Sequence, residues 1–424
     1  MKKILYIISA TVVAAVFSVS CNVLDRYPHN ATSSDNLSED DLVLLYNGLY
    51  CYSQYKPGFE GYFQNDMAGG DFTRGGGSSY ATPELWIKDC ILPTSGWMNG
   101  PWTGYYSLLF QINKFIQSAS KANQTAQVRE MLGVAYYFRG LTYYNLVSKY
   151  RSVQILREPT NEKVPNSPES ECWAFVEENL QNAIEMCPSF TTKNYVSVQA
   201  AKALMARAKL GMGKKQEAAT LAEEVISDPL FALADFEKIF RGEENSEEIF
   251  TFVNDKEENG INFASQFYQP ATTYVPTKEV TGLFTSQDKR MNISIQAQND
   301  ETVLNKYNNV TSTNPIIISR LAEMYLISAE GKGLAGGGDK RLNELRKFRG
   351  LPAKTFKDEE EFLDAVIAER RLEFLGEGFR WFDLVRTGRF DSTVDLPEKY
   401  KIFPIPQRQI DLNPDKLIQH DCWK

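Results

Sequence analysis

The stretch of this sequence that most constrains its fold lies near the C-terminus, at residues 367–388. It runs IAERRLEFLGEGFRWFDLVRTG. Glycine tolerates the backbone angles of a helix end, so the pattern predicts two helical segments broken at residues 376–378 and ended by Gly388. Charged residues alternate here with bulky apolar ones, whereas an exposed amphipathic helix would place them on separate faces. This mixture of charged and apolar residues predicts a network of polar side chains at least partly enclosed by the hydrophobic core.

The charges of this stretch allow two interpretations. Paired carboxylates can act as the acid and base of a catalytic site. Alternatively, arginines hold the carboxylates in bidentate pairs that stabilise the fold. We favour the structural interpretation, because charges so evenly matched mostly satisfy one another. The residues concerned are Glu369, Glu373, Glu377, Asp383, Arg370, Arg371, Arg380 and Arg386.

The first 20 residues have the pattern of a secretion signal. Lys2 and Lys3 precede an apolar run, which is shorter than the roughly 20 apolar residues of a spanning helix. The segment Ser18-Val19-Ser20-Cys21 resembles a bacterial lipobox, with Ser18 where leucine is usual. Acyl chains on Cys21, at about 0.8 kcal/mol per buried methylene, would anchor the protein durably. Residues 21–37 are polar and rich in turn formers, which predicts a tether.

Composition excludes several classes of function. Loss of residues 1–20 removes two lysines and no acid, which changes the formal net charge from −8 to −10. Such an acidic chain is unsuited to nucleic acid. The cysteines besides Cys21 are widely spaced and form no C-x-x-C pair, so neither a disulfide scaffold nor a zinc site is predicted. The sequence contains only two histidines, His29 and His420, which makes a catalytic triad that depends on histidine an unfavourable prediction. No cofactor is predicted.

Helical periodicity dominates the first half of the chain. Ser38 and Asp41 form a capping-box pattern that predicts an early helix. Many alanines between residues 200 and 222 let neighbouring helices approach closely, in a hairpin of the size of tetratricopeptide units but without their consensus spacing. We therefore predict a mostly α fold with a scaffold of tetratricopeptide-like helical pairs. The predicted helices cover residues 101–116, 127–149, 168–186, 198–212 and 216–227.

Two irregular regions interrupt this pattern, at about residues 56–100 and 230–316. Glycine clusters, prolines and scattered aromatic residues replace the periodicity there, and loops of such length usually serve a function. Within the second region, residues 249–253 predict a short strand, and a helix is predicted from Ile316 to Ser328. We expect residues 38–424 to form a single domain that carries both regions.

Six blocks in order along the chain resemble the SusD/RagB family of Bacteroidetes surface lipoproteins. The block at residues 369–386 is the family's most characteristic one. Three features depart from the family pattern: Arg151 in place of glycine, Gln154 in place of proline, and the ending at residues 419–423. The matching blocks are residues 21–28, 101–113, 139–150, 314–330 together with 342–346, 369–386 and 403–414.

This resemblance implies a helical core that bears an irregular ligand-binding region. It also implies a lipid anchor at the outer membrane, an outward orientation, and partnership with a SusC-like TonB-dependent transporter that the protein covers as a lid. Family members bind oligosaccharides most often, and some bind peptides. We expect non-catalytic binding of oligosaccharide nutrients. Peptide capture is one alternative, and a carboxylate-dependent glycoside hydrolase is another, since its acid pair would be distant in sequence.

A glycan-binding site needs exposed aromatic rings with amide or charged partners. Trp97 is the first candidate. It lies between Gly96 and Asn99 and outside the predicted helices, at about the place where family members present an aromatic ring to sugar. Alternatively, Trp97 pins its loop to the core. The predicted ligand-binding residues are Asp71, Arg74, Tyr80, Trp86, Trp97, Asn99, Tyr268 and Tyr274.

A second tryptophan and a pair of aspartates lie near these candidates. Trp102 begins a predicted helix, so we expect it to pack in the core. Asp66 and Asp71 could hold calcium, but their spacing matches no EF-hand loop. No metal site is predicted.

Overall fold

The computed structural model describes residues 37–78, 87–88, 90–254, 260–268, 272–310 and 314–424. The predicted signal, the lipidation site Cys21 and the tether up to residue 36 lie outside the described residues, as do Tyr80 and Trp86. Within the described part of the chain, no helix is long and apolar enough to cross a membrane.

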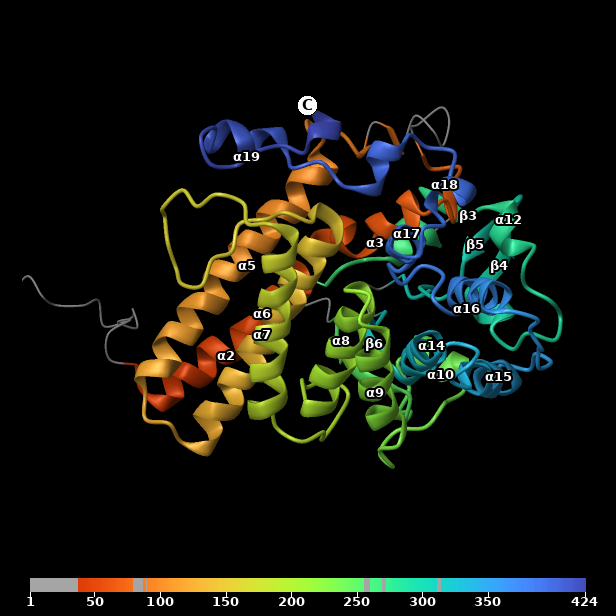
Figure 1. Cartoon of the computed structure of the whole chain (residues 1–424), viewed down its shortest axis with the longest axis horizontal. Coiled ribbons are helices and arrows are strands. Elements are labelled where there is room, and N and C mark those ends of the chain that lie inside the picture. Colours follow the sequence, from red (N-terminus) through yellow and green to blue (C-terminus); the bar gives the residue numbers. More distant parts are fainter. Residues whose placement is uncertain (1–36, 79–86, 89, 255–259, 269–271, 311–313) are drawn as a thin grey trace, which may run out of the picture.

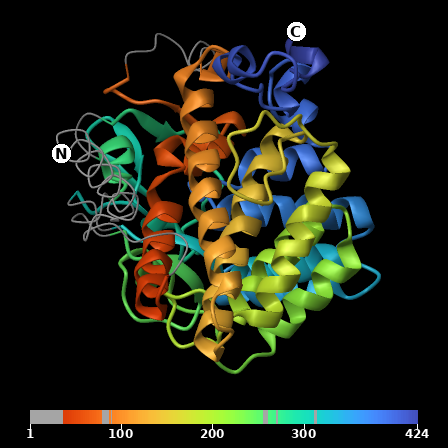
Figure 2. The same cartoon turned by 90° about the vertical axis from the view of Figure 1, so that its left-hand side faces the viewer.

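Consecutive helices pack side by side and form the larger part of the molecule (Figure 1). From α5 to α9 each helix lies against the next, and α9 lies against α14. In Figure 2 the red helix α2 and the long orange helix α5 lie side by side on the face toward the viewer. The predicted helical-pair scaffold is confirmed. Its helices are α2 (Glu39–Tyr55), α5 (Gly96–Lys121), α6 (Ala126–Tyr150), α7 (Glu169–Met186), α8 (Val198–Gly211), α9 (Lys215–Ile226) and α14 (Leu321–Lys332).

Hydrogen bonds between side chain and backbone fix the start of α2. Ser38 accepts a hydrogen bond from the Asp41 amide while the Asp41 side chain accepts one from the Ser38 amide, so the predicted capping box is confirmed.

A glycine permits close packing within α5. At Gly104, an added Cβ would lie 1.9 Å from the carbonyl oxygen of Lys56. Only glycine allows the turn that follows α2 to approach α5 so closely.

The first irregular region differs from its predicted loop. It contains α3 (Gly58–Ala68), and α5 begins at Gly96 instead of near residue 101. Phe63 and Met67 of α3 are buried in the main core, and α3 packs on both α5 and α17 (Arg380–Arg386). Tertiary packing stabilises α3, because helices of this length are marginal alone.

The strands form three separate antiparallel pairs among the described residues. The strand predicted at residues 249–253 is confirmed as β2. The helix predicted from Ile316 is wrong in its first turn, because residues 316–320 form a strand paired with β2 and α14 begins only at Leu321. Three consecutive isoleucines favour that strand. The pairs are β1 (Phe72–Arg74) with β3 (Tyr274–Pro276), β2 (Glu248–Phe252) with β6 (Ile316–Arg320), and β4 (Ile295–Gln298) with β5 (Glu301–Leu304).

Short helices fill the second irregular region, and the late helices pack beside it (Figure 1). The predicted break at residues 376–378 separates α16 from α17, with positive φ angles of 80° at Gly376 and 83° at Gly378. Gly388, at a φ of 70°, follows α17 as predicted. The elements are α10 (Phe236–Phe240), α11 (Ala264–Phe267), α12 (Lys278–Thr281), α13 (Met291–Ser294), α15 (Gly338–Phe348), α16 (Glu359–Glu373), α18 (Phe390–Thr393) and α19 (Gln407–Leu412).

Candidate functional site

A buried network of ion pairs, which we call the clasp, joins the late helices to the second irregular region. Its centre is Glu373, which is 0% exposed. Its carboxylate lies 2.5 Å from Arg320, 2.8 Å from Arg349 and 2.8 Å from Arg290. The clasp contains equal numbers of cations and carboxylates, so the charges balance. Its members are Arg290, Lys306, Arg320, Arg346, Arg349, Glu247, Asp288, Glu369, Glu373 and Glu377.

The clasp is unsuited to acid–base chemistry. Burial acts to raise the pKa of Glu373, but the charges of Arg349, Arg320 and Arg290 together hold it well below its usual value. A catalytic acid needs a pKa near the working pH and access to substrate. The structural interpretation of residues 367–388 is therefore the one that the geometry supports.

The stability of the clasp should depend on pH in the acid range. The folded-state pKa of Glu373 is depressed below its usual value of 4.5, and those of Glu377 and Asp383 are also lowered. Each therefore adds stability above its unfolded-state pKa, and that stability is lost as the pH falls through the folded-state value. We expect the free energy of unfolding in urea to fall steadily below about pH 4.5. A flat profile from pH 6 to pH 3 would contradict this.

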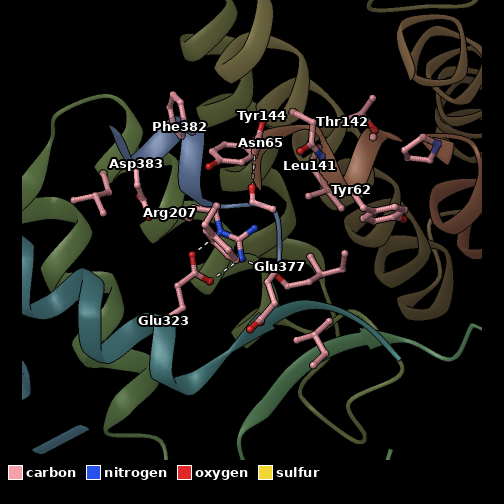
Figure 3. Close-up of a pocket in the computed structure, with 18 of the residues that line it drawn as sticks. Tyr62, Asn65, Leu141, Thr142, Tyr144, Arg207, Glu323, Glu377, Phe382 and Asp383 are labelled. Carbon is pink, nitrogen blue, oxygen red and sulfur yellow. Dashed lines mark hydrogen bonds and ion pairs between the residues drawn. The ribbon is translucent and has the colours of Figure 1, made fainter. Parts of the chain in front are cut away.

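An interior cavity of about 90 Å³ lies between the scaffold and α17 (Figure 3). Small-molecule sites usually measure roughly 300–1,000 Å³, so this cavity is too small for a sugar ring. Four of the charged residues that line it pair with one another: Arg207 with Glu323 at 2.6 Å and Arg370 with Asp383 at 2.7 Å. The small volume of the cavity and the ion pairs in its lining both indicate a gap in the packing instead of a ligand-binding site.

The structure brings the two irregular regions together. Pairing of β1 with β3 places Arg74 opposite Tyr274. The ring of Trp97 lies 6.0 Å from that of Tyr274 and 6.4 Å from that of Phe59, perpendicular or nearly so to both. We call these three rings the aromatic ledge. Trp97 is half-buried and Arg74 is exposed, and each of them neighbours Tyr274.

Trp97 is in the first turn of α5, so its predicted position outside a helix is wrong. In an α-helix the carbonyl of Trp97 would accept from the amide of residue 101, but Pro101 has no amide hydrogen. Gln64 of α3 donates to that carbonyl instead. The oxygen of the Gln64 side chain in turn accepts from Lys149 at 3.2 Å. Both partners are buried, so the core fixes the backbone that carries the Trp97 ring.

The other predicted ligand-binding residues occupy different environments. Asp71 is 1% exposed and lies 2.7 Å from Arg371, which makes it part of a buried ion pair and corrects its assignment to an exposed site. Tyr274 is 4% exposed, so it is a buried ring of the ledge that packs against Trp97 and Phe59, which corrects its assignment to an exposed site. Asn99 accepts a hydrogen bond of 3.0 Å from Gln409. Trp102 is buried, as predicted.

Asp66 has no access to solvent. It is fully buried and accepts a hydrogen bond of 2.7 Å from the amide of Gly378. Burial, followed by the nearby charge of Asp71, raises the pKa of Asp66 to about 8. Because Asp66 has no exposed surface, its carboxylate is not open to a calcium ion from solvent.

Tyr268 lines an open groove instead of the aromatic ledge. The groove measures about 1130 Å³ and lies between α10, α13 and the β4–β5 hairpin. The hydroxyl of Tyr268 donates to the side-chain oxygen of Gln296 at 3.1 Å. Apart from Tyr268, sequence reasoning missed the groove, because short polar segments carry no periodic signal. Its amide side chains are Asn292, Gln296, Asn305 and Asn308.

The fold and these sites define a helical scaffold protein with an aromatic ledge, an open polar groove and a buried network of paired charges. The chain belongs to the SusD family, whose model matches residues 148–401. A second family model, described as starch-binding associating with outer membrane, matches residues 22–210. The family resemblance seen in the sequence is therefore confirmed.

Individual relatives agree with this assignment. SusD-like protein P38 of Formosa agariphila is 25% identical over 415 residues, covering 79% of this chain and 82% of the relative. A laminarin-binding SusD-like protein has a TM-score of 0.77 at 23% identity, covering 91% of this chain and 100% of the other. Surface glycan-binding protein A of Bacteroides thetaiotaomicron, solved with laminarihexaose, has a TM-score of 0.76 at 21% identity, covering 90% and 99%. By name, these two solved structures are a laminarin-binding protein and a glycan-binding protein.

Proposed function

We propose that this protein binds oligosaccharides at the cell surface without cleaving them. The observation that carries the proposal is the aromatic ledge: Trp97 is half-buried, with Asn99 in the same helical turn and Arg74 exposed on β1. An aromatic ring packs on the C–H face of a sugar, and amide and guanidinium groups bond its hydroxyls. One structural neighbour is a laminarin-binding protein, and another was solved in complex with laminarihexaose.

The family also suggests what happens to the captured ligand. We propose that acyl chains on Cys21 anchor the mature protein in the outer membrane, facing outward, and that it delivers its ligand to a SusC-like TonB-dependent transporter as a lid. The lipobox-like segment at residues 18–21 and the association of the matched family with the outer membrane support this. Co-purification of the native lipoprotein with a large β-barrel transporter would test the partnership.

A binding panel tests the capture function. The mature chain without its lipid should bind laminarihexaose, maltohexaose or another neutral oligosaccharide in isothermal titration calorimetry. Chromatography of the same mixtures should return the saccharides uncleaved. Cleavage would indicate a hydrolase, and binding restricted to peptides would indicate the alternative ligand class. Failure to bind any saccharide or peptide, alone or with the transporter, would refute the proposal.

A further inference from the structure

A second surface of this protein has the chemistry of a carbohydrate site. We propose that the open groove between α10, α13 and the β4–β5 hairpin binds neutral oligosaccharides independently of the aromatic ledge. The choice of saccharide as ligand rests on the proposed function, whereas the location rests on the groove itself. Neither Trp97 nor Arg74 lines the groove.

The size of the groove suits an extended ligand. Its volume of about 1130 Å³ slightly exceeds the usual roughly 300–1,000 Å³ of a small-molecule pocket. The β4–β5 hairpin, α13 and α10 line it, together with Asn305 and Asn308, which follow β5. An open channel of this kind admits several consecutive sugar rings and leaves the ends of a chain in solvent.

The lining of the groove combines apolar contact with hydrogen bonding. Ile293 and Ile295 are half-buried and offer apolar surface to the C–H faces of sugar rings, and Tyr268 adds an aromatic ring. Gln296 accepts from the Tyr268 hydroxyl, and no described residue accepts from its amide nitrogen. That nitrogen and the exposed side chain of Asn292 can bond sugar hydroxyls.

The charges of the groove favour a neutral ligand. Two acids, Asp235 and Glu237, face two bases, Arg241 and Lys289, so the lining has no net charge. Arg241 already donates to the carbonyls of Asn305 at 3.2 Å and of Lys306 at 3.3 Å. A lining without net charge gives no long-range attraction to a charged polymer. Amide groups, which donate and accept equally, match the hydroxyls of a saccharide.

The clasp holds this groove in shape. Arg290, which precedes α13, pairs with Glu373 at 2.8 Å, and Lys306, which follows β5, pairs with Glu377 at 2.7 Å. Asn305 also donates to the carbonyl of Asn292 at 2.7 Å, which ties the two walls together. Walls fixed before binding reduce the entropy lost when the ligand binds.

Hydrogen exchange read by mass spectrometry can locate the saccharide. We expect saturating laminarihexaose or maltohexaose to slow exchange in peptides covering residues 289–298 and 302–308. This protection should persist in Trp97→Ala and disappear in Tyr268→Ala combined with Gln296→Ala. The matched control is Tyr195→Ala, which removes a 55% exposed tyrosine that does not line the groove. Asn292→Ala, at an exposed side chain, provides a second variant if the double variant fails to fold.

The possible outcomes separate the two proposals. Protection confined to peptides around residues 59–64 and 96–103 would overturn the groove site and leave the ledge in place. Protection of the groove alone would support the groove site and overturn the ledge. Protection of the groove by neutral peptides but not by saccharides would overturn the inference, and protection of neither region by any saccharide would overturn both proposals.

Discussion

Replacing Glu373 with alanine should lower the free energy of unfolding by about 3–5 kcal/mol, the usual cost of removing one partner from a buried ion pair. Glu373 has no exposed surface and pairs with Arg290, Arg320 and Arg349. Its loss leaves three guanidinium groups close together in a region of low dielectric. Urea unfolding of the purified variant, followed by circular dichroism, measures the change.

Two variants calibrate this result. Glu398→Ala removes a carboxylate with an 87% exposed side chain and should change stability by less than about 0.5 kcal/mol. Arg380→Ala should have an effect between the two, because Arg380 lies 3.6 Å from Asp71 and has fewer close partners. Below their unfolding temperatures, the Glu373→Ala and Arg380→Ala variants should rank saccharides in the wild-type order. A stable Glu373→Ala protein with altered ligand preference would contradict the structural role of the clasp.

Replacing Trp97 with alanine should weaken oligosaccharide binding at the ledge by about 1–3 kcal/mol, by analogy with bases stacked on aromatic side chains. This corresponds to a roughly 5- to 150-fold increase in Kd. The helix should survive the change, because Ser95 and Gln64 bond only backbone atoms of residue 97. Calorimetric titration with the saccharide selected from the panel measures the loss.

Trp97→Phe provides the matched variant, since it keeps a ring at the same backbone position. It should retain most of the affinity, while thermal unfolding should show both variants to be folded. Equal affinity of the alanine variant and the wild type would remove Trp97 from the binding site. The ring would then serve only to pack against Phe59 and Tyr274.

The scaffold was largely predictable because its signals are local. Helical periodicity, capping residues and helix-ending glycines located α6 to α9, and glycines located the break between α16 and α17. The errors fall where distant residues decide the local structure. Gly58–Ala68 is helical because α5 and α17 cover it, and residues 316–320 form a strand because β2 is available as a partner.

The candidate sites were predictable only in part, for a related reason. Aromatic residues in irregular sequence pointed to Trp97 and Tyr274, and the structure places their rings in contact. Sequence alone could not show that Asp71 is buried against Arg371, since the two lie 300 positions apart. The groove around Tyr268 was missed because its other residues lie in short polar segments. Such segments indicate a site only once the fold brings them together.

By itself the sequence determined the family, the helical scaffold and the presence of a polar network at residues 367–388, since patterns of spacing and composition carry all three. The tertiary structure decided which charges pair within that network, because the partners Arg290, Arg320 and Arg349 come from other segments. It also decided which aromatic rings reach the surface and which polar segments meet in a groove. Burial and pairing depend on contacts between residues far apart in the chain, and no local pattern records them.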